Sequence, residues 1–455
     1  MMLGAKVSVA RALGAIARAS GRGGGTSLPG MLLQRLDRDA IGTLARRLPR
    51  GSALLSATNG KTTTAALAAN ILAKAAIPIV HNRAGANMAS GVASALLDAV
   101  GPKGTIKGEL GLFEVDEFWL PSVSAQLAPR SLLLANLFRD QLDRYGELEA
   151  IADRWAAVVA AAPGELGLVL CSDDPLVADL GRGREATYFG VRDDRLALPE
   201  IQHAADSKHC RRCGAPLQYL AVYLGHLGRY RCPNGHDPQP EPTVQAVEVE
   251  LHGVHSATFS LISAAGRAHV ELPLPGLYNV YNALGAAALC LSLGVALGDV
   301  VAGLQDAEAA FGRAETIAVD GRALSIMLIK NPAGANEVLR TLVLEPGQHD
   351  VLGVLNDGIA DGRDVSWIWD ADFELLASRL RGVTCSGTRA DELGVRLKYA
   401  GVAPEKIAIV GDLPDAFDSA RAAGNGTLYA LPTYTALLQL RGLLADRGVA
   451  ARFWR

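Results

Sequence analysis

The residues best suited to chemistry stand together at positions 58–63, where the chain reads Thr-Asn-Gly-Lys-Thr-Thr. A short apolar run, residues 52–56, precedes them, and a helical pattern, residues 65–76, follows them. A glycine turn between a strand and a helix aims backbone N–H groups and the positive end of the helix at a phosphate. A lysine in that turn can reach the β- and γ-phosphates of a nucleotide, and the next hydroxyl suits Mg²⁺. We therefore expect the phosphates of ATP to be bound by Thr58, Asn59, Gly60, Lys61, Thr62 and Thr63.

The turn departs from the standard phosphate-loop pattern in one place. That pattern has a glycine five residues before the position of Gly60, and this chain has Leu55 there. An ordinary helix N-terminus with a threonine cap is the alternative. The strand–turn–helix order is the context that the motif requires, and it favours phosphate binding.

Acidic side chains follow two later strands. One cluster, residues 114–117, ends the apolar run 111–115, and a second, residues 136–144, follows the run 131–137. Ligands of parallel sheets bind at the carboxyl ends of the strands, and Mg²⁺ prefers one or two carboxylates together with phosphate oxygens and water. Either cluster alone would indicate a solvated loop, but two of them downstream of a phosphate loop favour a nucleotide–metal site. We expect the Mg²⁺ ligands to be Thr62 and Glu114.

Three of the six cysteines have the spacing of a zinc ribbon. Cys210 and Cys213 form one knuckle, and Cys232 begins a second in an equally polar segment. Three thiolates and one imidazole close a tetrahedral site, so the expected Zn²⁺ is structural. The expected ligands are Cys210, Cys213, Cys232 and His236, with His209 and His226 as alternatives for the fourth. The remaining cysteines stand in apolar surroundings and are expected to pack in cores: Cys171, Cys290 and Cys385.

The composition bounds the class of protein. The chain has 455 residues, of which 49% are hydrophobic and 20% charged, so it can bury more than one core. The net charge of −3 argues against a dedicated nucleic-acid-binding protein, and we expect no nucleic-acid partner. We find no uninterrupted apolar run of about 18 residues, so no membrane-spanning helix is expected.

Strand-like and helix-like segments alternate from residue 51 onward, which predicts a doubly wound, mostly parallel α/β sheet. The cysteine-bearing insert at about 205–240 interrupts this rhythm, and residues 243–275 alternate like antiparallel strands. The expected organisation is a basic N-terminal segment (1–50), a central ATP-binding domain (51–310) and a smaller α/β C-terminal domain (311–455). Buried strands are expected at 52–56, 77–80, 111–115, 131–137, 168–171, 351–355, 382–386 and 407–410.

The N-terminal segment is basic. Residues 1–50 carry nine lysines and arginines but only two acidic residues, and residues 7–18 have an amphipathic helical pattern. Arg11 and Arg18 interrupt any apolar core of a secretory signal. Two interpretations stay open: a solvated basic helix packed on the main body, or contact with an anionic membrane surface.

The order of these motifs resembles that of the Mur ligases, which are ATP-dependent enzymes that form amide bonds through an acyl phosphate. The phosphate loop, the acids at 114–117 and 136–144, and the later asparagines and arginine carry this resemblance. It implies that the nucleotide also lies near Asn279, Asn282 and Arg313. Further segments resemble the MurT branch of the family, the synthetase subunit of the lipid II isoglutaminyl synthase: 81–88, 136–147, the cysteine-rich insert, 330–334 and 356–367.

The resemblance implies a specific reaction. ATP would activate the α-carboxyl of D-glutamate in the lipid II stem peptide, and ammonia from a GatD glutaminase subunit would convert it to D-isoglutamine for peptidoglycan synthesis. It also implies that Asp364 completes the Cys–His–Asp triad of that partner, where an aspartate orients the histidine. The alternative for Asp364 is an N-cap of a helix over 366–380.

The chain also departs from the Mur ligase pattern. Ala57 stands where these enzymes usually have glycine, and Gln141 stands where many place a histidine near the metal. The roughly fifty residues before the phosphate loop are too few for a UDP-binding domain, which favours a lipid-linked substrate. We therefore expect a cytoplasmic protein, peripheral at the inner face of the cell membrane. The alternatives are a folylpolyglutamate-synthase-like ligase and a zinc-ribbon binding module with a vestigial nucleotide site.

Overall fold

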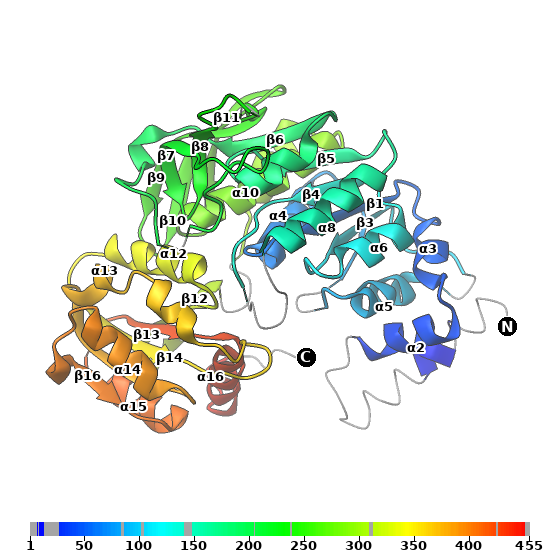
Figure 1. Cartoon of the computed structure of the whole chain (residues 1–455). Helices are drawn as coiled ribbons and strands as arrows, with labels where there is room; N and C mark the ends of the chain where they lie inside the picture. Colours follow the sequence, from blue (N-terminus) through cyan, green and yellow to red (C-terminus); the bar gives the residue numbers. More distant parts are fainter. Residues whose placement is uncertain are drawn as a thin grey trace.

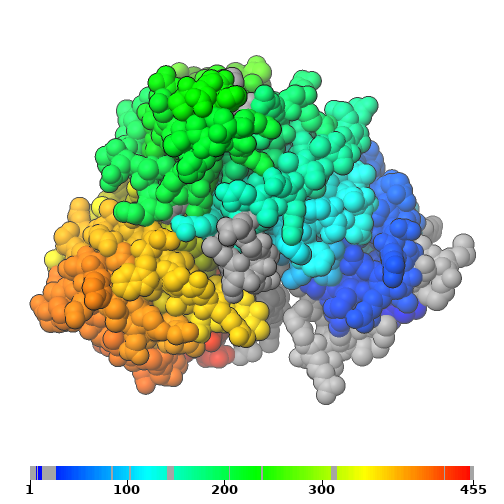
Figure 2. Space-filling view, in the orientation of Figure 1, coloured from blue at the N-terminus to red at the C-terminus, as the bar shows by residue number. Residues whose placement is uncertain are grey.

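The computed structural model describes residues 7, 9–12, 27–82, 86–101, 104–140, 148–203, 205–236, 239–308, 313–424 and 426–450. Two large sheets organise these residues, one in the central part of the chain and one in the C-terminal part (Figure 1). In the space-filling view, the yellow part of the C-terminal unit abuts the green segment of the central unit, and the blue N-terminal residues lie at the other end (Figure 2).

The central sheet has nine strands in the order β11-β10-β9-β6-β5-β4-β1-β3-β2. The pairs from β2 to β9 are parallel, and β9, β10 and β11 are antiparallel. The strands are β1 (Ser52–Ser56), β2 (Ile79–His81), β3 (Leu110–Glu114), β4 (Ser131–Leu134), β5 (Gly167–Cys171), β6 (Ala186–Val191), β9 (Val244–His252), β10 (Ser256–Ser263) and β11 (Gly266–Leu272).

Helices cover both faces of this sheet (Figure 1). Helices α4 (Lys61–Lys74), α10 (Leu277–Ser292) and α11 (Leu297–Gln305) pack together on one face. The other helices of this unit are α2 (Leu28–Leu36), α3 (Ala40–Ala45), α5 (Ala89–Ala99), α6 (Leu120–Leu127), α8 (Leu148–Ala161) and the short α9 (Pro175–Ala178).

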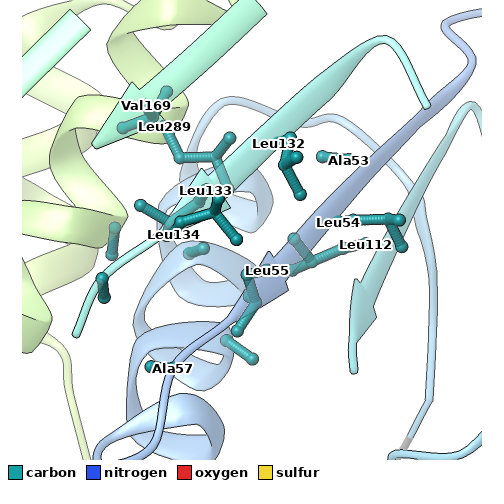
Figure 3. Close-up of a cluster of buried hydrophobic side chains, with 14 of the residues drawn as sticks. Ala53, Leu54, Leu55, Ala57, Leu112, Leu132, Leu133, Leu134, Val169 and Leu289 are labelled. Atoms are coloured by element: carbon teal, nitrogen blue, oxygen red, sulfur yellow. The ribbon is translucent and has the colours of Figure 1, made fainter. Parts of the chain in front are cut away.

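Because both faces are covered, the inner parallel strands are apolar along most of their length. Every residue of β1, β3 and β4 is buried. Leu54 and Leu55 of β1, Leu133 of β4 and Leu289 of α10 form part of this core (Figure 3). The tight packing fixes the carboxyl ends of the strands, where the predicted site residues lie.

The C-terminal sheet has six strands in the order β12-β13-β17-β14-β15-β16, with only the β12–β13 pair antiparallel. Its strands are β12 (Arg313–Val319), β13 (Arg322–Met327), β14 (His349–Val354), β15 (Leu380–Ser386), β16 (Ile407–Ile409) and β17 (Leu428–Pro432). Its helices are α12 (Pro332–Val343), α13 (Glu374–Ala377), α14 (Ala390–Tyr399), α15 (Leu413–Ala422) and α16 (Tyr434–Asp446).

The cysteine-bearing insert contains a small antiparallel hairpin of its own, formed by β7 (Gln218–Leu224) and β8 (Leu227–Arg231). The antiparallel strands predicted over 243–275 are confirmed, and they extend the central sheet rather than forming a separate one.

The prediction of a helix over 366–380, which was the alternative interpretation for Asp364, is wrong. A 3₁₀ helix, Ser366–Asp370, is followed by extended backbone at Ala371, the short α13 and then β15. The side chain of Asn336 holds Asp372, because its Oδ1 accepts from the Asp372 N–H at 2.7 Å and its Nδ2 donates to the carboxylate at 2.8 Å. This attachment to α12 stops the helix from continuing.

The described N-terminal residues pack on the main body. Val7 and Ala10 are buried, and the Arg11 guanidinium donates to the carbonyl of Leu97 at the C-terminal end of α5 at 2.5 Å. A cation at that end of a helix is favourable, so the packed interpretation holds for these residues. In the described part of the chain, no helix combines the length and apolar content needed to cross a membrane.

Candidate active site

The phosphate loop has a backbone conformation that only glycine tolerates. Strand β1 ends at Ser56, and α4 begins at Lys61, directly after Gly60. Gly60 has φ +83°, and a Cβ added to it would lie 1.9 Å from Oδ1 of Asn282 on α10. Both the left-handed backbone and the contact exclude a side chain. Helix α4 starts four residues earlier than predicted, which places the first N–H groups of the helix at the loop.

The side chain of Asn136, which follows β4, fixes the loop. Its Oδ1 accepts from the N–H of Asn59 at 2.9 Å, and its Nδ2 donates to the Asn59 carbonyl at 3.0 Å. The Thr58 hydroxyl accepts a bond from the N–H of Phe138 at 3.1 Å. Because these groups bond one another, the turn is held in shape by protein atoms alone.

Lys61 is buried at the base of the loop and pairs with Glu117, in the segment that follows β3. Its Nζ lies 2.7 Å from Oε2 of Glu117 and also donates to the carbonyl of Ala57. Burial alone would lower the pKa of Lys61, but the carboxylates of Glu117 and Asp116 raise it above its ordinary value. Burial likewise opposes ionisation of Glu117, but Lys61 keeps the pKa of that carboxyl low. Lys61 therefore carries its positive charge in the site.

Thr62 and Glu114, the predicted Mg²⁺ ligands, lie side by side. The Thr62 hydroxyl donates to Oε1 of Glu114 at 3.0 Å. Asn82 fixes the backbone of Glu114, since its Oδ1 accepts from the Glu114 N–H at 2.9 Å and its Nδ2 donates to the carbonyl at 2.7 Å. A hydroxyl and a carboxylate beside a phosphate loop are a donor set that fits Mg²⁺. These two oxygens would hold the ion, which neutralises phosphate charge when bound.

The two asparagines of α10 stand near the loop. The Nδ2 of Asn282 donates to Oδ1 of Asn279 at 3.0 Å, and the hydroxyl of Thr64 donates to Oδ1 of Asn282 at 3.3 Å. Asn279 in turn donates to the carbonyl of Pro275 at 2.8 Å. Arg313 is the first residue of β12, and its side chain lies outside the described part of the structure.

Two residues of the C-terminal unit also reach the loop. Lys330 donates to the carbonyl of Thr58 at 3.1 Å and pairs with Asp140. Asn331 and Asn59 exchange side-chain amide bonds of 3.0 and 3.3 Å. Sequence reasoning missed both roles, as it missed Glu117. The segment 330–334 was part of the family resemblance, and that was the only signal available for Lys330 and Asn331.

A cleft opens beside the loop. Gly60 and Asn282 line its phosphate end, and residues of both units form its walls. Most of the lining is apolar, with a few convergent polar groups, which is typical of a small-molecule site. The lining consists of Asn59, Gly60, Thr63, Asn136, Phe138, Leu224, Leu227, Tyr278, Tyr281, Asn282, Met327, Leu328, Lys330, Ala333, Gly334, Glu337 and Val338.

The three thiols of the insert converge. The Sγ atoms of Cys210, Cys213 and Cys232 all lie within 4.8 Å of one another, and those of Cys213 and Cys232 are 3.5 Å apart. Tetrahedral coordination with Zn–S bonds of about 2.3 Å places sulfur atoms roughly 3.8 Å apart, so the cluster fits zinc. Two hydrogen bonds lower the pKa of Cys213 to about 6. The bond from the backbone of Ala215 has the larger effect, and the bond from the side chain of Asn234 has the smaller one. That shift favours the thiolate form that binds metal.

The histidines near the cluster differ in position. Nδ1 of His236 lies 3.9 Å from Sγ of Cys232. Among the described residues, however, the group of ligand atoms that all lie within 4.8 Å of one another consists of the three thiols without His236, so His236 as fourth ligand stays a prediction. His226 is fully buried against Phe138, with ring centroids 4.5 Å apart, and its Nε2 lies 3.4 Å from Asp174. It is therefore a core residue. His209 is exposed and forms an isolated bridge with Pro216.

Comparison with known proteins identifies the family. A model of the Mur ligase middle domain matches residues 56–236, and a MurT ligase C-terminal model matches residues 328–437. The chain is 32% identical over 416 residues to "Lipid II isoglutaminyl synthase (glutamine-hydrolyzing) subunit MurT" of Staphylococcus aureus, and the match covers 91% of each chain. The chain belongs to the MurT family of Mur ligases.

The fold of this MurT-family chain is shared with solved structures. A pseudomurein peptide ligase type C from Methanothermus fervidus aligns with TM-score 0.66 and 22% identity, covering 89% of this chain and 80% of that one. Mycobacterium tuberculosis folylpolyglutamate synthase, complexed with ADP and AMPPCP, aligns with TM-score 0.61 and 14% identity, covering 89% and 94%. These likenesses confirm the predicted Mur-ligase-like fold.

Asp364 lies in the loop that follows β14, in the segment that resembled MurT. It is exposed, and its Oδ1 accepts from the N–H of Ser366, the first residue of the 3₁₀ helix, at 2.8 Å, while the N-cap position of that helix is Val365. Bonds from Ser366 lower the pKa of Asp364 below its ordinary value, so the carboxylate is ionised. It lines a pocket together with Asp140 and Lys330. Gln141, Asp143 and Arg144 lie outside the described residues.

Replacing Gly60 tests the loop geometry. We expect Gly60→Ala to weaken ATP binding at least about tenfold and to destabilise the fold by roughly 1–3 kcal/mol, because a Cβ would strain the backbone and meet Asn282. Calorimetric titration and thermal unfolding would measure the two effects. Gly442→Ala on exposed α16, where a Cβ meets no atom within 4 Å, is the control. Wild-type affinity in Gly60→Ala would contradict the assignment.

Metal analysis tests the thiol cluster of this MurT-family protein. The purified chain should contain close to one zinc ion, and Cys213→Ser should lose most of it because serine supplies no thiolate. Cys290→Ala, a change in the apolar core, is the matched control and should keep the metal. A metal-free wild-type protein with intact fold would show that the cluster does not bind zinc.

Proposed function

We propose that this chain uses ATP to amidate the α-carboxyl of D-glutamate in the stem peptide of lipid II, which gives D-isoglutamine. The name of the Staphylococcus aureus relative and the match along almost the whole chain support this substrate. One structural observation carries the proposal: Lys61, the Thr62–Glu114 pair and Lys330 of the other unit all converge on the same loop. That arrangement suits transfer of a phosphoryl group.

The proposed reaction has two steps. A carboxylate resists attack by an amine because its oxygen leaves poorly. In the first step the carboxylate oxygen attacks the γ-phosphorus of ATP, the bond to the β-phosphate oxygen breaks, and ADP leaves. In the second step the ammonia nitrogen attacks the acyl carbon, the bond from carbon to the phosphate-bearing oxygen breaks, and phosphate leaves. The proton lost by nitrogen passes to the departing phosphate or to solvent.

The chain contributes positioning and charge to these steps. The N–H groups at the start of α4 and the charged Lys61 stabilise negative charge that spreads over the transferred phosphoryl group. Thr62 and Glu114 would hold Mg²⁺ beside the same oxygens. The pairing of Lys61 with Glu117 keeps the amine charged and aimed in one direction before the nucleotide binds.

Ammonia is proposed to come from a second subunit. The cysteines of this chain do not suit glutamine hydrolysis, because Cys210, Cys213 and Cys232 lie together in the proposed zinc site and the other three are buried. Burial raises the pKa of those three thiols: Cys171, Cys290 and Cys385. A GatD-type glutaminase would supply the nucleophile, and the exposed, ionised Asp364 would orient its histidine. Because lipid II is a membrane lipid, the complex would work at the inner face of the membrane.

A folylpolyglutamate-synthase-like activity is the alternative that shares this fold. At 14% identity, that likeness concerns the fold alone. The thiol cluster and the C-terminal match to the MurT model favour amidation instead.

Substitution of Lys61 tests the phosphate site. We expect Lys61→Ala to lower ATP turnover by at least about 100-fold, as loss of one charge-stabilising donor does elsewhere. ADP release in the presence of lipid II, ammonia and Mg²⁺ would measure it. Lys74→Ala, at the solvent end of the same helix, is the control and should leave turnover unchanged. Normal turnover in Lys61→Ala would remove the phosphate loop from the mechanism.

Substitution of Asp364 tests the partner's triad. We expect Asp364→Asn to abolish amidation that uses glutamine, while amidation with added ammonium salt stays at the wild-type rate, because only the histidine of the partner loses its orienting charge. Product formation by the two-subunit complex would be followed with each nitrogen source. Asp391→Asn on the exposed start of α14 is the control. Equal loss with both sources would assign Asp364 a structural role.

A further inference from the structure

A buried carboxylate, Glu337, lies in the wall of the cleft. It stands on α12, on the helix face that also presents Ala333, Gly334 and Val338 to the cleft. Only 4% of Glu337 is exposed. An acid so deeply buried is unusual, since transfer of a carboxylate from water into protein is costly unless its oxygens are bonded.

One oxygen of the Glu337 carboxylate lacks the hydrogen-bond partner that such burial requires. Its Oε1 has no hydrogen-bond partner among the described residues. The Nη1 of Arg340 lies 3.7 Å away, beyond hydrogen-bond distance. Burial raises the pKa of Glu337 to about 7, although the charge of Arg340 acts in the opposite direction. An unbonded buried acceptor requires an explanation, and the place of Glu337 in the cleft wall favours a donor from a bound ligand.

The place of Glu337 in the cleft indicates which part of the ligand it would meet. Asn331, the N-cap of α12, bonds Asn59 of the phosphate loop. Glu337 is six residues further on, which is roughly 9 Å along the helix at about 1.5 Å per residue. A nucleotide whose phosphates occupy the loop would therefore present its nucleoside, rather than its γ-phosphate, to Glu337.

The surroundings of Glu337 fit a nucleoside. Tyr278 and Tyr281 line the same cleft, and so do Leu224 and Leu227 of the insert hairpin. The hydroxyl of Tyr281 donates to Asp173 at 2.8 Å, so this hydroxyl is already bonded. These side chains supply apolar walls, and Glu337 is an acceptor among them. Ribose hydroxyls and the amino group of adenine are the nucleoside groups that can donate to it.

We propose that Glu337 is a nucleotide-specificity residue, whose carboxylate accepts hydrogen bonds from the nucleoside of ATP through either the ribose hydroxyls or the exocyclic amino group. This inference rests on the proposed function only in taking ATP as the ligand. Glu337 would act in binding and selection and would take no part in the transfer of the phosphoryl group.

Direct binding to the full-length chain tests the proposal. The dissociation constants of ATP, 2′-deoxyATP and the triphosphate of purine riboside, which lacks the amino group, would be measured with Mg²⁺ by calorimetry. We expect Glu337→Gln to weaken ATP binding about 10- to 100-fold, as loss of a hydrogen bond to a charged group does. In the wild type, one of the two analogues should bind more weakly than ATP, and this difference in dissociation constant should disappear in the variant. If the variant no longer discriminates ATP from 2′-deoxyATP, Glu337 contacts the ribose. If it no longer discriminates ATP from the purine riboside triphosphate, Glu337 contacts the amino group.

Controls separate recognition from folding. Glu405→Gln on the exposed surface should bind ATP like the wild type. If thermal unfolding shows that Glu337→Gln is not folded, Glu337→Asp replaces it. That variant should weaken ATP binding but keep the difference in affinity between ATP and the analogue. Wild-type affinity in the Glu337 variant, or an equal loss for all three nucleotides, overturns the proposal. A wild-type chain that binds no ATP overturns the proposed function as well.

Discussion

The contact between Gly60 and the amide of Asn282 constrains everything around the phosphate loop. A side chain at Gly60 would overlap Asn282, so α10 can approach α4 only because the turn ends in glycine. This approach brings the asparagines of α10 to the start of α4 and places the first N–H groups of that helix at the cleft. The conformation needs no bound phosphate, because Asn136 holds the backbone of Asn59 on the opposite side.

The same loop also attaches the C-terminal unit. Lys330 and Asn331 follow β13 directly and bond Thr58 and Asn59, so the unit is placed by contacts with the residues that would hold the phosphates. Lys330 lines both the nucleotide cleft and the pocket of Asp364. The proposed sites of carboxylate activation and of partner contact therefore share one residue. Any movement of α12 would alter the phosphate loop and the Asp364 pocket together.

The sequence predicted the parts of the site that are local in the chain. The strand, glycine turn and helix at 52–74 could be recognised because few residue types satisfy the tight turn between them, and the thiol cluster could be recognised because the spacing of its cysteines is restricted. Lys330 and Asn331 could not be found in this way, since their partners lie 272 residues away. Strands β6, β7, β8, β12, β13 and β17 were not predicted either, and the helix over 366–380 was overridden by the bonds of Asn336.

The charges around the loop explain why Mg²⁺ would be needed there. The positive charges of two lysines are already balanced by carboxylates, because Lys61 pairs with Glu117 and Lys330 pairs with Asp140. The acid Glu114 lies beside Thr62. Burial and the charge of Glu117 raise the pKa of neighbouring Asp116. A triphosphate entering this loop would add several negative charges to a site whose cations are already paired. A divalent cation held by Thr62 and Glu114 would offset that repulsion, which gives the carboxylate at the end of β3 a physical reason to lie beside Thr62 of the loop.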